Sequence, residues 1–237
     1  MGSKCEIGYY SVIMENVQLG NEVSIGNNVV IYPRTIIGDG VSIADNSVLG
    51  KQPKPAKTST VKINDALAPL SIGAGTIIGT SCVIYAGSSL GQFCMTGDLA
   101  TIRENCKLGD YVLVGRGVAV ENFVEIGDYT KIQTGAYITA HSSLAERVFI
   151  APMVTTTNDN FMGRTEKRFK SIKGPSIQKG ARIGGGAILL PGVNIGEETF
   201  IAAGALVTKN TSEAMVVKGL PAKAYKEVNQ DELLENS

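Results

Sequence analysis

The sequence predicts an all-β fold, a parallel β-helix, from three regularities that run along most of the chain. From Ile72 to Thr156 every sixth residue is aliphatic, apart from threonine at Thr96 and Thr156. A small or β-branched residue follows four positions later, and glycine often comes directly after the aliphatic residue. A period of six fits neither an α-helix nor simple strand alternation. It fits a strand, a corner and a strand, with two residues of every six pointing inward.

The period begins near the N-terminus and is broken twice. The first hexads are headed by Ile7, Ile13, Leu19, Ile25, Ile31, Ile37, Ile43 and Leu49. A Pro- and Lys-rich break follows, and residues 55–71 are predicted to leave the helix as a loop excursion. The regular block from Ile72 then ends at a second excursion, predicted over 162–176, and further hexads begin at Ile177. At three hexads a turn this gives about ten coils in a single domain, 1–237, with a tail (213–237) predicted to form a short helix.

Composition narrows the class of protein. Lys+Arg and Asp+Glu are both 22, so no net charge draws the chain to nucleic acid or to an anionic membrane. No apolar run approaches the roughly 18 residues of a membrane span, and the first residues lack the apolar core of a signal peptide. We therefore expect a cytoplasmic protein. Cys82, Cys94 and Cys106 occupy small inward positions and are expected to be buried thiols; their spacing does not suit a metal site.

The outward residues of successive coils can be sorted by side of the prism. The first side carries Ile77, Met95, Leu113, Lys131 and Phe149, and the second carries Val83, Thr101, Ala119, Tyr137 and Thr155. The third side carries the polar set Ser89, Lys107, Glu125 and Ser143. Two different apolar sides favour a head-to-tail ring of subunits. We expect a homotrimer.

Hexads of the form Ile-Gly-x-x-Val-x resemble those of the left-handed β-helix acyltransferases, the hexapeptide transferase superfamily. Left-handedness follows from this resemblance, because the period alone does not give it. The resemblance implies an enzyme that uses acetyl-CoA or another acyl-CoA as co-substrate without a metal. It also implies active sites between the subunits of a trimer.

Three stretches resemble one branch, the nucleotide amino-sugar N-acyltransferases: Gly97–Asn105, Thr157–Asp159 and Val217–Lys223. In that branch the amine of a UDP- or dTDP-linked sugar attacks the acyl thioester. The resemblance implies substrate-binding roles for Ser88, Arg103, Glu104, Asn105, Asn158, Asp159 and Arg164. We predict that coenzyme A lies along the C-terminal coils, where Ala203 and Gly204 expose backbone. Lys209, Lys218 and Lys223 can meet its phosphates there, and Pro221 belongs to the same predicted site. The Gly-x-Pro-Ala-Lys close is shared with O-acetyltransferases.

Two residues are candidates for the catalytic base that takes the proton of an attacking ammonium. Asp98 lies on a corner beside the register anomaly at Thr96, and a carboxylate also holds the ammonium before its proton leaves. His141 is the only histidine. It is expected to stack about 5 Å from Asp159, one coil away, which would raise its basicity. We predict Asp98 as the base and His141 with Asp159 as the alternative.

Both excursions are basic, and their side chains are expected to hold the phosphates of coenzyme A or a nucleotide sugar. The first contains Lys51, Lys54, Lys57 and Lys62, and the second contains Arg164, Lys167, Arg168, Lys170 and Lys173. An O-acetyltransferase acting on a sugar or serine hydroxyl with a histidine base stays open, as does a binding solenoid. A metal-dependent hydratase of the carbonic-anhydrase type is excluded, since its metal needs about three histidines.

Overall fold

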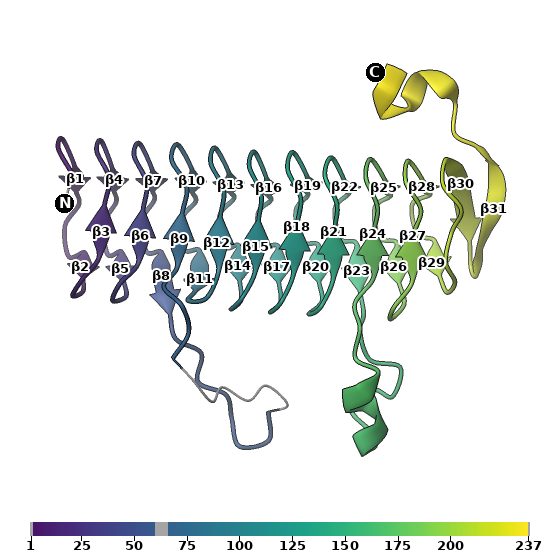
Figure 1. Ribbon diagram of the computed structural model, residues 1–237, viewed down its shortest axis with the longest axis horizontal. Coiled ribbons are helices and arrows are strands. Elements are labelled where there is room, and N and C mark those ends of the chain that lie inside the picture. The colour runs from purple at the N-terminus through teal and green to yellow at the C-terminus, as the bar shows by residue number, and fades with distance from the viewer. Residues whose placement is uncertain (1, 60–65, 237) are drawn as a thin grey trace.

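The protein is a long parallel β-helix, seen from the side in Figure 1. The computed structural model describes residues 2–59 and 66–236. Within them the strands, mostly of two residues, stack into three sheets along the prism. Each coil contributes one strand to each sheet, and successive coils lie 18 residues apart, as where Ile84 pairs with Ile102. The predicted all-β parallel β-helix is confirmed.

The strand bounds follow the hexads. The first sheet contains β1 (Glu6–Ile7), β4 (Ser24–Ile25), β7 (Ser42–Ile43), β10 (Ile77–Ile78), β13 (Met95–Thr96), β16 (Leu113–Val114), β19 (Lys131–Ile132), β22 (Phe149–Ile150), β25 (Arg182–Ile183), β28 (Phe200–Ile201), β30 (Met215–Gly219) and β31 (Ala222–Glu227). The second contains β2 (Val12–Ile13), β5 (Val30–Ile31), β8 (Val48–Lys51), β11 (Val83–Tyr85), β14 (Thr101–Ile102), β17 (Ala119–Val120), β20 (Tyr137–Ile138), β23 (Thr155–Thr156), β26 (Ile188–Leu189) and β29 (Leu206–Val207). The third contains β3 (Gln18–Leu19), β6 (Ile36–Ile37), β9 (Ser71–Ile72), β12 (Ser89–Leu90), β15 (Lys107–Leu108), β18 (Glu125–Ile126), β21 (Ser143–Leu144), β24 (Ser176–Ile177) and β27 (Asn194–Ile195).

The core is a column of stacked side chains from the two inward positions of each hexad. Aliphatic residues at the first position, such as Ile102 and Ile132, are fully buried, and each contributes roughly 1.5–3 kcal/mol. Cys82, Cys94 and Cys106 are free and buried at the second position, as predicted. Burial raises the pKa of the Cys106 thiol to about 12.

The two threonines that break the aliphatic pattern are buried but hydrogen-bonded. Thr156 Oγ1 donates to the Tyr137 carbonyl at 3.1 Å and accepts the Thr139 amide at 2.7 Å. Thr96 Oγ1 accepts the Gly79 amide at 3.3 Å. Because these hydroxyls have partners inside the coil, the core tolerates them without unpaired polar atoms.

Between sheets the chain turns at three corners, which define three columns along the prism. The first corner joins the first sheet to the second, the second corner joins the second to the third, and the third corner returns to the first. Most turns place one residue at positive φ, including His141 at 61° and Tyr111 at 57°. Which corner a residue occupies therefore decides which other side chains it can meet.

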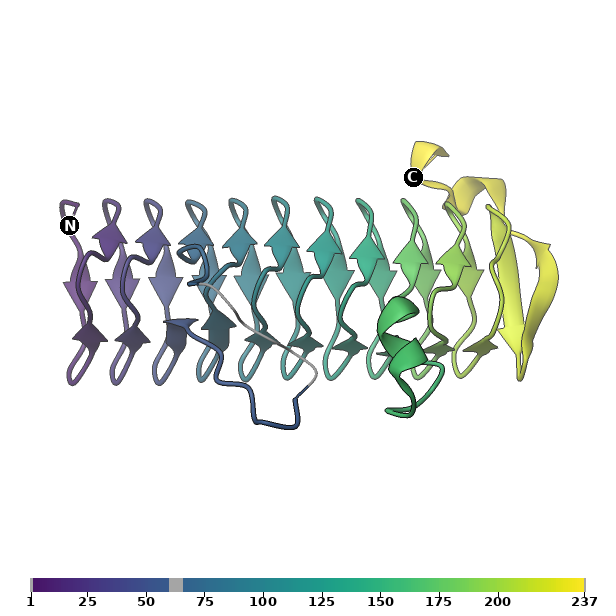
Figure 2. The same cartoon turned by 60° about the horizontal axis from the view of Figure 1, so that its bottom comes forward.

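Both excursions leave the prism at the second corner and project from the same side (Figures 1 and 2). The first leaves after β8 and returns at β9, so Ser71 already belongs to the helix and the predicted end at 71 is one residue late. The second departs after β23 instead of at 162, and returns at β24. It carries a short 3₁₀ helix, η1 (Glu166–Lys170). Lys62 lies outside the described residues.

The predicted C-terminal helix is wrong. Residues 215–227 form an antiparallel hairpin, β30 and β31, and β30 pairs in parallel with β28. Two 3₁₀ turns follow, η2 (Gln230–Glu232) and η3 (Leu234–Asn236). The β-branched Val216 and Val217 suit a strand, and pairing with β28 satisfies a sheet edge that the last coil would leave open. In the part of the chain that is described, no helix is long and apolar enough to cross a membrane.

Candidate functional site

Residues of both excursions line a cleft at the second corner. The cleft has a volume of about 860 Å³. Its walls come from the excursions and its floor from the coils between them. It is lined by Thr58, Ser59, Glu121, Asn122, Phe123, Tyr137, Thr139, Ala140, His141, Asn158, Glu166, Arg168, Phe169 and Ile172. These residues lie far apart in sequence, and the common corner of departure brings them together.

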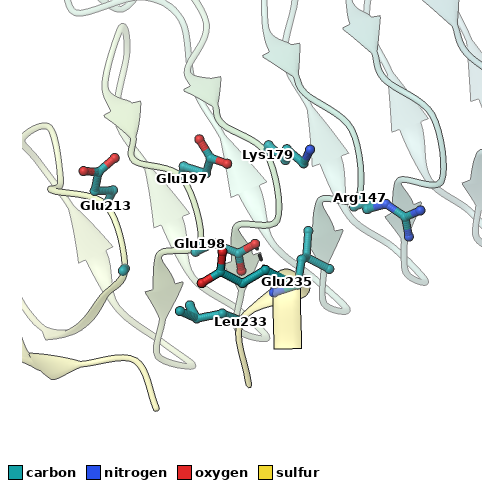
Figure 3. Close-up of a pocket in the computed structure, with 9 residues that line it drawn as sticks. Arg147, Lys179, Glu197, Glu198, Glu213, Leu233 and Glu235 are labelled. Atoms are coloured by element: carbon teal, nitrogen blue, oxygen red, sulfur yellow. Dashed lines mark hydrogen bonds between the residues drawn. The ribbon is translucent and has the colours of Figure 1, made fainter. Parts of the chain in front are cut away.

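A second cavity, of about 760 Å³, lies at the third corner beneath the C-terminal tail (Figure 3). It is lined by Arg147, Lys179, Glu197, Glu198, Glu213, Ala214, Leu233, Leu234 and Glu235. The tail is fastened there, because the Leu234 amide donates to Glu198 at 3.2 Å and Arg182 pairs with Glu232 at 2.9 Å. Acids outnumber bases in this cavity, so it suits neither coenzyme A nor a nucleotide phosphate.

His141 lies on the cleft floor and is oriented by an aromatic neighbour. Its ring stacks on Phe123 of the preceding coil, with centroids 5.1 Å apart and planes 5° from parallel. Asn105 occupies the same corner position one coil before Phe123, so the three form a column. The His141 amide donates to the Asn122 carbonyl at 3.2 Å. Stacking and the corner turn together fix the imidazole against the cleft.

The expected pairing of His141 with Asp159 does not form. Asp159 closes the start of the second excursion instead: its two carboxylate oxygens accept the amides of Phe161 (2.8 Å) and Gly163 (2.9 Å). It also pairs with Arg168 at 3.0 Å. These hydrogen bonds, the one from Gly163 most strongly, hold the pKa of the carboxyl below its usual range. The register prediction fails because the chain leaves the coil before Asp159.

Asn158 keeps the position that the repeat predicts. Its side-chain amide donates to the Ala140 carbonyl of the preceding coil at 3.3 Å, and it lines the cleft. Arg164 is exposed on the second excursion and does not line the cleft.

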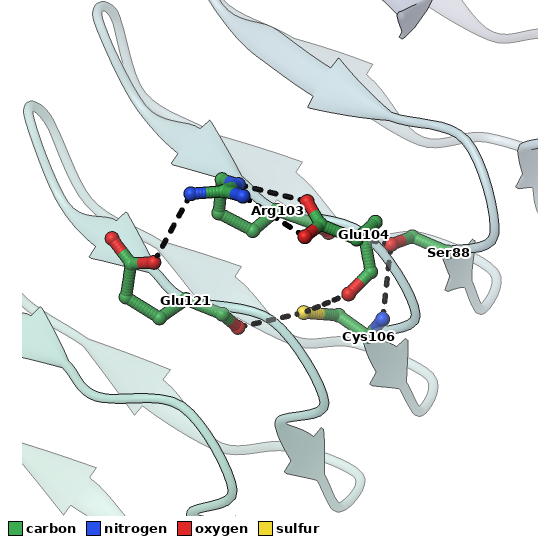
Figure 4. Close-up of polar contacts among 5 residues, drawn as sticks. All are labelled: Ser88, Arg103, Glu104, Cys106 and Glu121. Atoms are coloured by element: carbon green, nitrogen blue, oxygen red, sulfur yellow. Dashed lines mark hydrogen bonds and ion pairs between the residues drawn. The ribbon is translucent and has the colours of Figure 1, made fainter. Parts of the chain in front are cut away.

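Arg103, Glu104 and Glu121 form a charged network at the edge of the cleft (Figure 4). Arg103 binds Glu104 through two hydrogen bonds of 2.8 and 2.9 Å, and reaches Glu121 at 3.4 Å. The Glu104 side chain is only 2% exposed, so its charge is balanced by the guanidinium. The same guanidinium lies 5.2 Å from the ring centroid of Tyr85.

Ser88 supports this network from inside the prism. It is buried, and its hydroxyl donates to the Arg103 carbonyl at 2.7 Å and accepts the Cys106 amide at 3.0 Å (Figure 4). Both hydroxyl functions are thus used on backbone groups. The structure does not bring Ser88 into the cleft.

Asp98 lies on the first corner, apart from this cleft. Its carboxylate accepts the Thr80 amide of the preceding coil at 2.9 Å. Asp110 and Asp128, on the third corner, do the same for the amides of Gln92 (2.7 Å) and Asp110 (2.8 Å). Asp98 therefore makes the same hydrogen bond to the preceding coil as Asp110 and Asp128, for which no catalytic role was predicted.

The residues expected to bind coenzyme A lie in the last coils. Ala203 and Gly204 are on the first corner, where Gly204 has φ 68° and open space beyond its Cα. Lys218 and Lys223 face each other across the β30–β31 hairpin, with Pro221 in its turn. Lys209 lines a hollow of about 260 Å³ beside the hairpin.

Sequence reasoning missed Glu121 and Tyr137 as cleft residues, and it named Arg168 only among the basic residues expected to hold phosphates. A usable signal was present, because both excursions interrupt the repeat after a second-sheet hexad and so must leave from one corner. Tyr137 is 39% exposed, and its partial burial, followed by the charge of Glu121, raises the pKa of its hydroxyl. No group of three or more His, Cys, Asp or Glu suited to a metal ion occurs among residues 2–59 and 66–236.

Comparison with known proteins agrees with the coils. Residues 1–32 and 18–51 match the bacterial transferase hexapeptide family (six repeats), and residues 176–209 match the hexapeptide repeat of succinyl-transferase. Between these matches the coils continue with the same period. The chain therefore carries hexapeptide repeats of the kind that these transferase family models describe. The resemblance seen in its hexads is thereby confirmed.

Individual relatives of this hexapeptide-repeat protein match only part of it. Serine acetyltransferase of Buchnera aphidicola is 35% identical over 86 residues, 36% of this chain and 31% of that protein. The 2,3,4,5-tetrahydropyridine-2,6-dicarboxylate N-acetyltransferase of Staphylococcus aureus (strain JH9) is 39% identical over 54 residues, 23% of each chain. The chain thus spans less than a third of either protein's length. The solved UDP-N-acetylglucosamine acyltransferase of Francisella novicida is 18% identical, with a TM-score of 0.42 over 98% of this chain and 68% of that one.

Proposed function

We propose that this hexapeptide-repeat protein is an acyl-CoA-dependent N-acyltransferase acting on the amine of a UDP- or dTDP-linked amino sugar. One observation carries the proposal: residues of both excursions line one cleft with the only histidine of the sequence, which is stacked on Phe123. A cleft of about 860 Å³ is large enough for a sugar and part of a nucleotide. The partial relatives with acetyltransferase names support the same reaction class.

In the proposed reaction His141 is the base. Its imidazole takes a proton from the substrate ammonium, and the neutral amine attacks the thioester carbonyl. A carbon–nitrogen bond forms and the carbon–sulfur bond breaks. The imidazolium returns its proton to the departing thiolate, and the nitrogen of the tetrahedral intermediate loses its second proton to solvent. Coenzyme A and the neutral amide are the products. Asp98, favoured by the sequence, lies on another corner and already accepts the Thr80 amide.

We place acyl-CoA along the last coils. Gly186 and Gly204 leave bare backbone on the first corner, with open space beyond each Cα. A thin pantetheine chain can lie on such a ridge, and the hairpin lysines Lys218 and Lys223 can meet its phosphates. Buried reduced cysteines favour a reducing compartment, and we propose the cytoplasm.

We further propose that the working unit is a homotrimer. Ile77, Met95 and Phe149 are aligned along the first sheet, and each is exposed. A row of this kind supports a subunit contact along the prism. Sedimentation should give the mass of a trimer, and replacing Met95 by glutamate should dissociate it. A stable wild-type monomer at micromolar concentration would disprove this assembly.

The reaction is tested by following thiol release from acetyl-CoA with a panel of UDP- and dTDP-linked amino sugars and their hydroxyl counterparts. His141→Asn should lower kcat by about 10²- to 10⁴-fold, the usual cost of losing a general base. Asp98→Asn should behave like the matched corner variant Asp110→Asn and retain near-normal turnover. If Asp98→Asn abolishes turnover and His141→Asn does not, the assignment of the base is reversed. Transfer to hydroxyl acceptors alone would favour an O-acetyltransferase.

A further inference from the structure

The charges on the cleft do not balance. Two carboxylates, Glu121 and Glu166, and one guanidinium, Arg168, line it. Arg168 is already paired with Asp159 at 3.0 Å. Among the residues that the structure describes, no basic residue of the excursions other than Arg168 lines the cleft. The floor of this cleft therefore suits a cationic group of the ligand, such as a sugar ammonium, better than it suits a phosphate.

Glu121 is the carboxylate on the cleft floor, and its charge is only partly neutralised. The guanidinium of Arg103 forms its two short bonds with Glu104, at 2.8 and 2.9 Å, and only a 3.4 Å contact with Glu121. One guanidinium thus faces two carboxylates, and it interacts more closely with the buried Glu104 than with Glu121. The Glu121 side chain is 26% exposed and can accept a further donor from the cleft.

The rest of the network holds Glu121 in place. Arg103 is fixed from below by Glu104 and lies against Tyr85, and the Ser88 hydroxyl holds its backbone carbonyl. Tyr137 lines the same cleft, and burial, followed by the negative charge of Glu121, raises the pKa of its hydroxyl. The floor thus offers one preorganised carboxylate on the same corner as His141.

We infer that Glu121 selects an amine over a hydroxyl acceptor by binding the ammonium form of the sugar, with Arg103 as its positioning residue. This inference rests on the proposed function and deepens it. A protonated amine gains a charge-assisted hydrogen bond with Glu121, whereas a hydroxyl gains only a weaker, neutral one. His141 then receives the proton from an amine that Glu121 has already placed.

The test is a calorimetric comparison of binding without coenzyme A. Each UDP- and dTDP-linked amino sugar is measured against the same nucleotide sugar with a hydroxyl in place of the amine. The wild type should bind its preferred amino sugar about 10- to 100-fold more tightly than the hydroxyl form, as a charge-assisted bond predicts. Glu121→Gln should lose most of that preference, Glu121→Asp should keep part of it, and the exposed control Glu125→Gln should keep all of it.

Steady-state kinetics give a second readout, the change in KM relative to kcat. A purely structural role of Glu121 would not produce a selective change in KM. Glu121→Gln should raise KM for the amino sugar by about the same factor and change kcat much less. Equal wild-type affinity for amine and hydroxyl forms, or an undiminished preference in Glu121→Gln, would overturn the inference while leaving acyl transfer intact. If no amino sugar binds or is acylated by the wild type, the proposed function itself fails and this inference fails with it.

Discussion

Removing the charge of Arg103 should destabilise the protein more than any exposed ion pair can. In Arg103→Met the methionine fills a similar volume but leaves Glu104, with a side chain 2% exposed, without its bidentate partner. Breaking a buried ion pair from one side typically costs about 3–5 kcal/mol. Arg103 itself is 27% exposed, so water can reach part of the site, and we take the lower end, about 3 kcal/mol.

The expected loss is large enough to measure by thermal unfolding. For a chain of this size each kcal/mol shifts Tm by about 2–4 °C, so Arg103→Met should unfold about 6–12 °C lower. The double variant Arg103→Met/Glu104→Gln removes both charges and should recover most of the loss. The matched control is Lys107→Met, which breaks an exposed pair with Glu125 (3.1 Å, side chains 74% and 62% exposed) and should cost about 1 kcal/mol or less.

Circular dichroism and calorimetry, run on all variants at one protein concentration, supply the comparison. Equal melting temperatures for Arg103→Met and Lys107→Met would refute the reasoning, because burial of Glu104 would then have no energetic consequence. A double variant as unstable as the single one would refute it as well, since lost packing and not the uncompensated charge would be the cause.

Three other predictions concern the core, the tail and the corner ridge. Because burial raises the pKa of the Cys106 thiol to about 12, a thiol reagent at pH 8 should titrate only Cys5 in the native protein and all four cysteines after unfolding; rapid native reaction of more than one would contradict this. The Arg182 side chain lowers the pKa of Glu232, so their bond adds stability above the ordinary carboxyl pKa of about 4.3 and loses it as pH falls through the lower folded value. Glu232→Gln should therefore make the C-terminal tail more sensitive to protease at pH 7. Unchanged cleavage would show that the Arg182–Glu232 ion pair does not hold the tail. Gly204→Ala, at φ 68°, should cost about 1–2 kcal/mol in stability and raise KM for acyl-CoA severalfold, whereas an unchanged KM would move the coenzyme elsewhere.

The hexads by themselves determined the fold and which residues point inward. They also determined which outward residues share a side of the prism. Ile84 and Ile102 stack because both head a hexad 18 residues apart, and no distant partner has to be known. The burial of Cys82, Cys94 and Cys106 followed from the same count. In a solenoid each coil contacts its neighbours in sequence, so a local period carries nearly all of the long-range information.

The tertiary structure alone decided what happens wherever the period stops. Asp159 follows the repeat in number, but its own loop amides and Arg168 take its carboxylate, so His141 stands without it. The tail became a hairpin because β28 offered an unpaired edge to the β-branched Val216 and Val217. The uneven sharing of Arg103 between Glu104 and Glu121 depends on distances of a few tenths of an ångström, and spacing in sequence does not encode them.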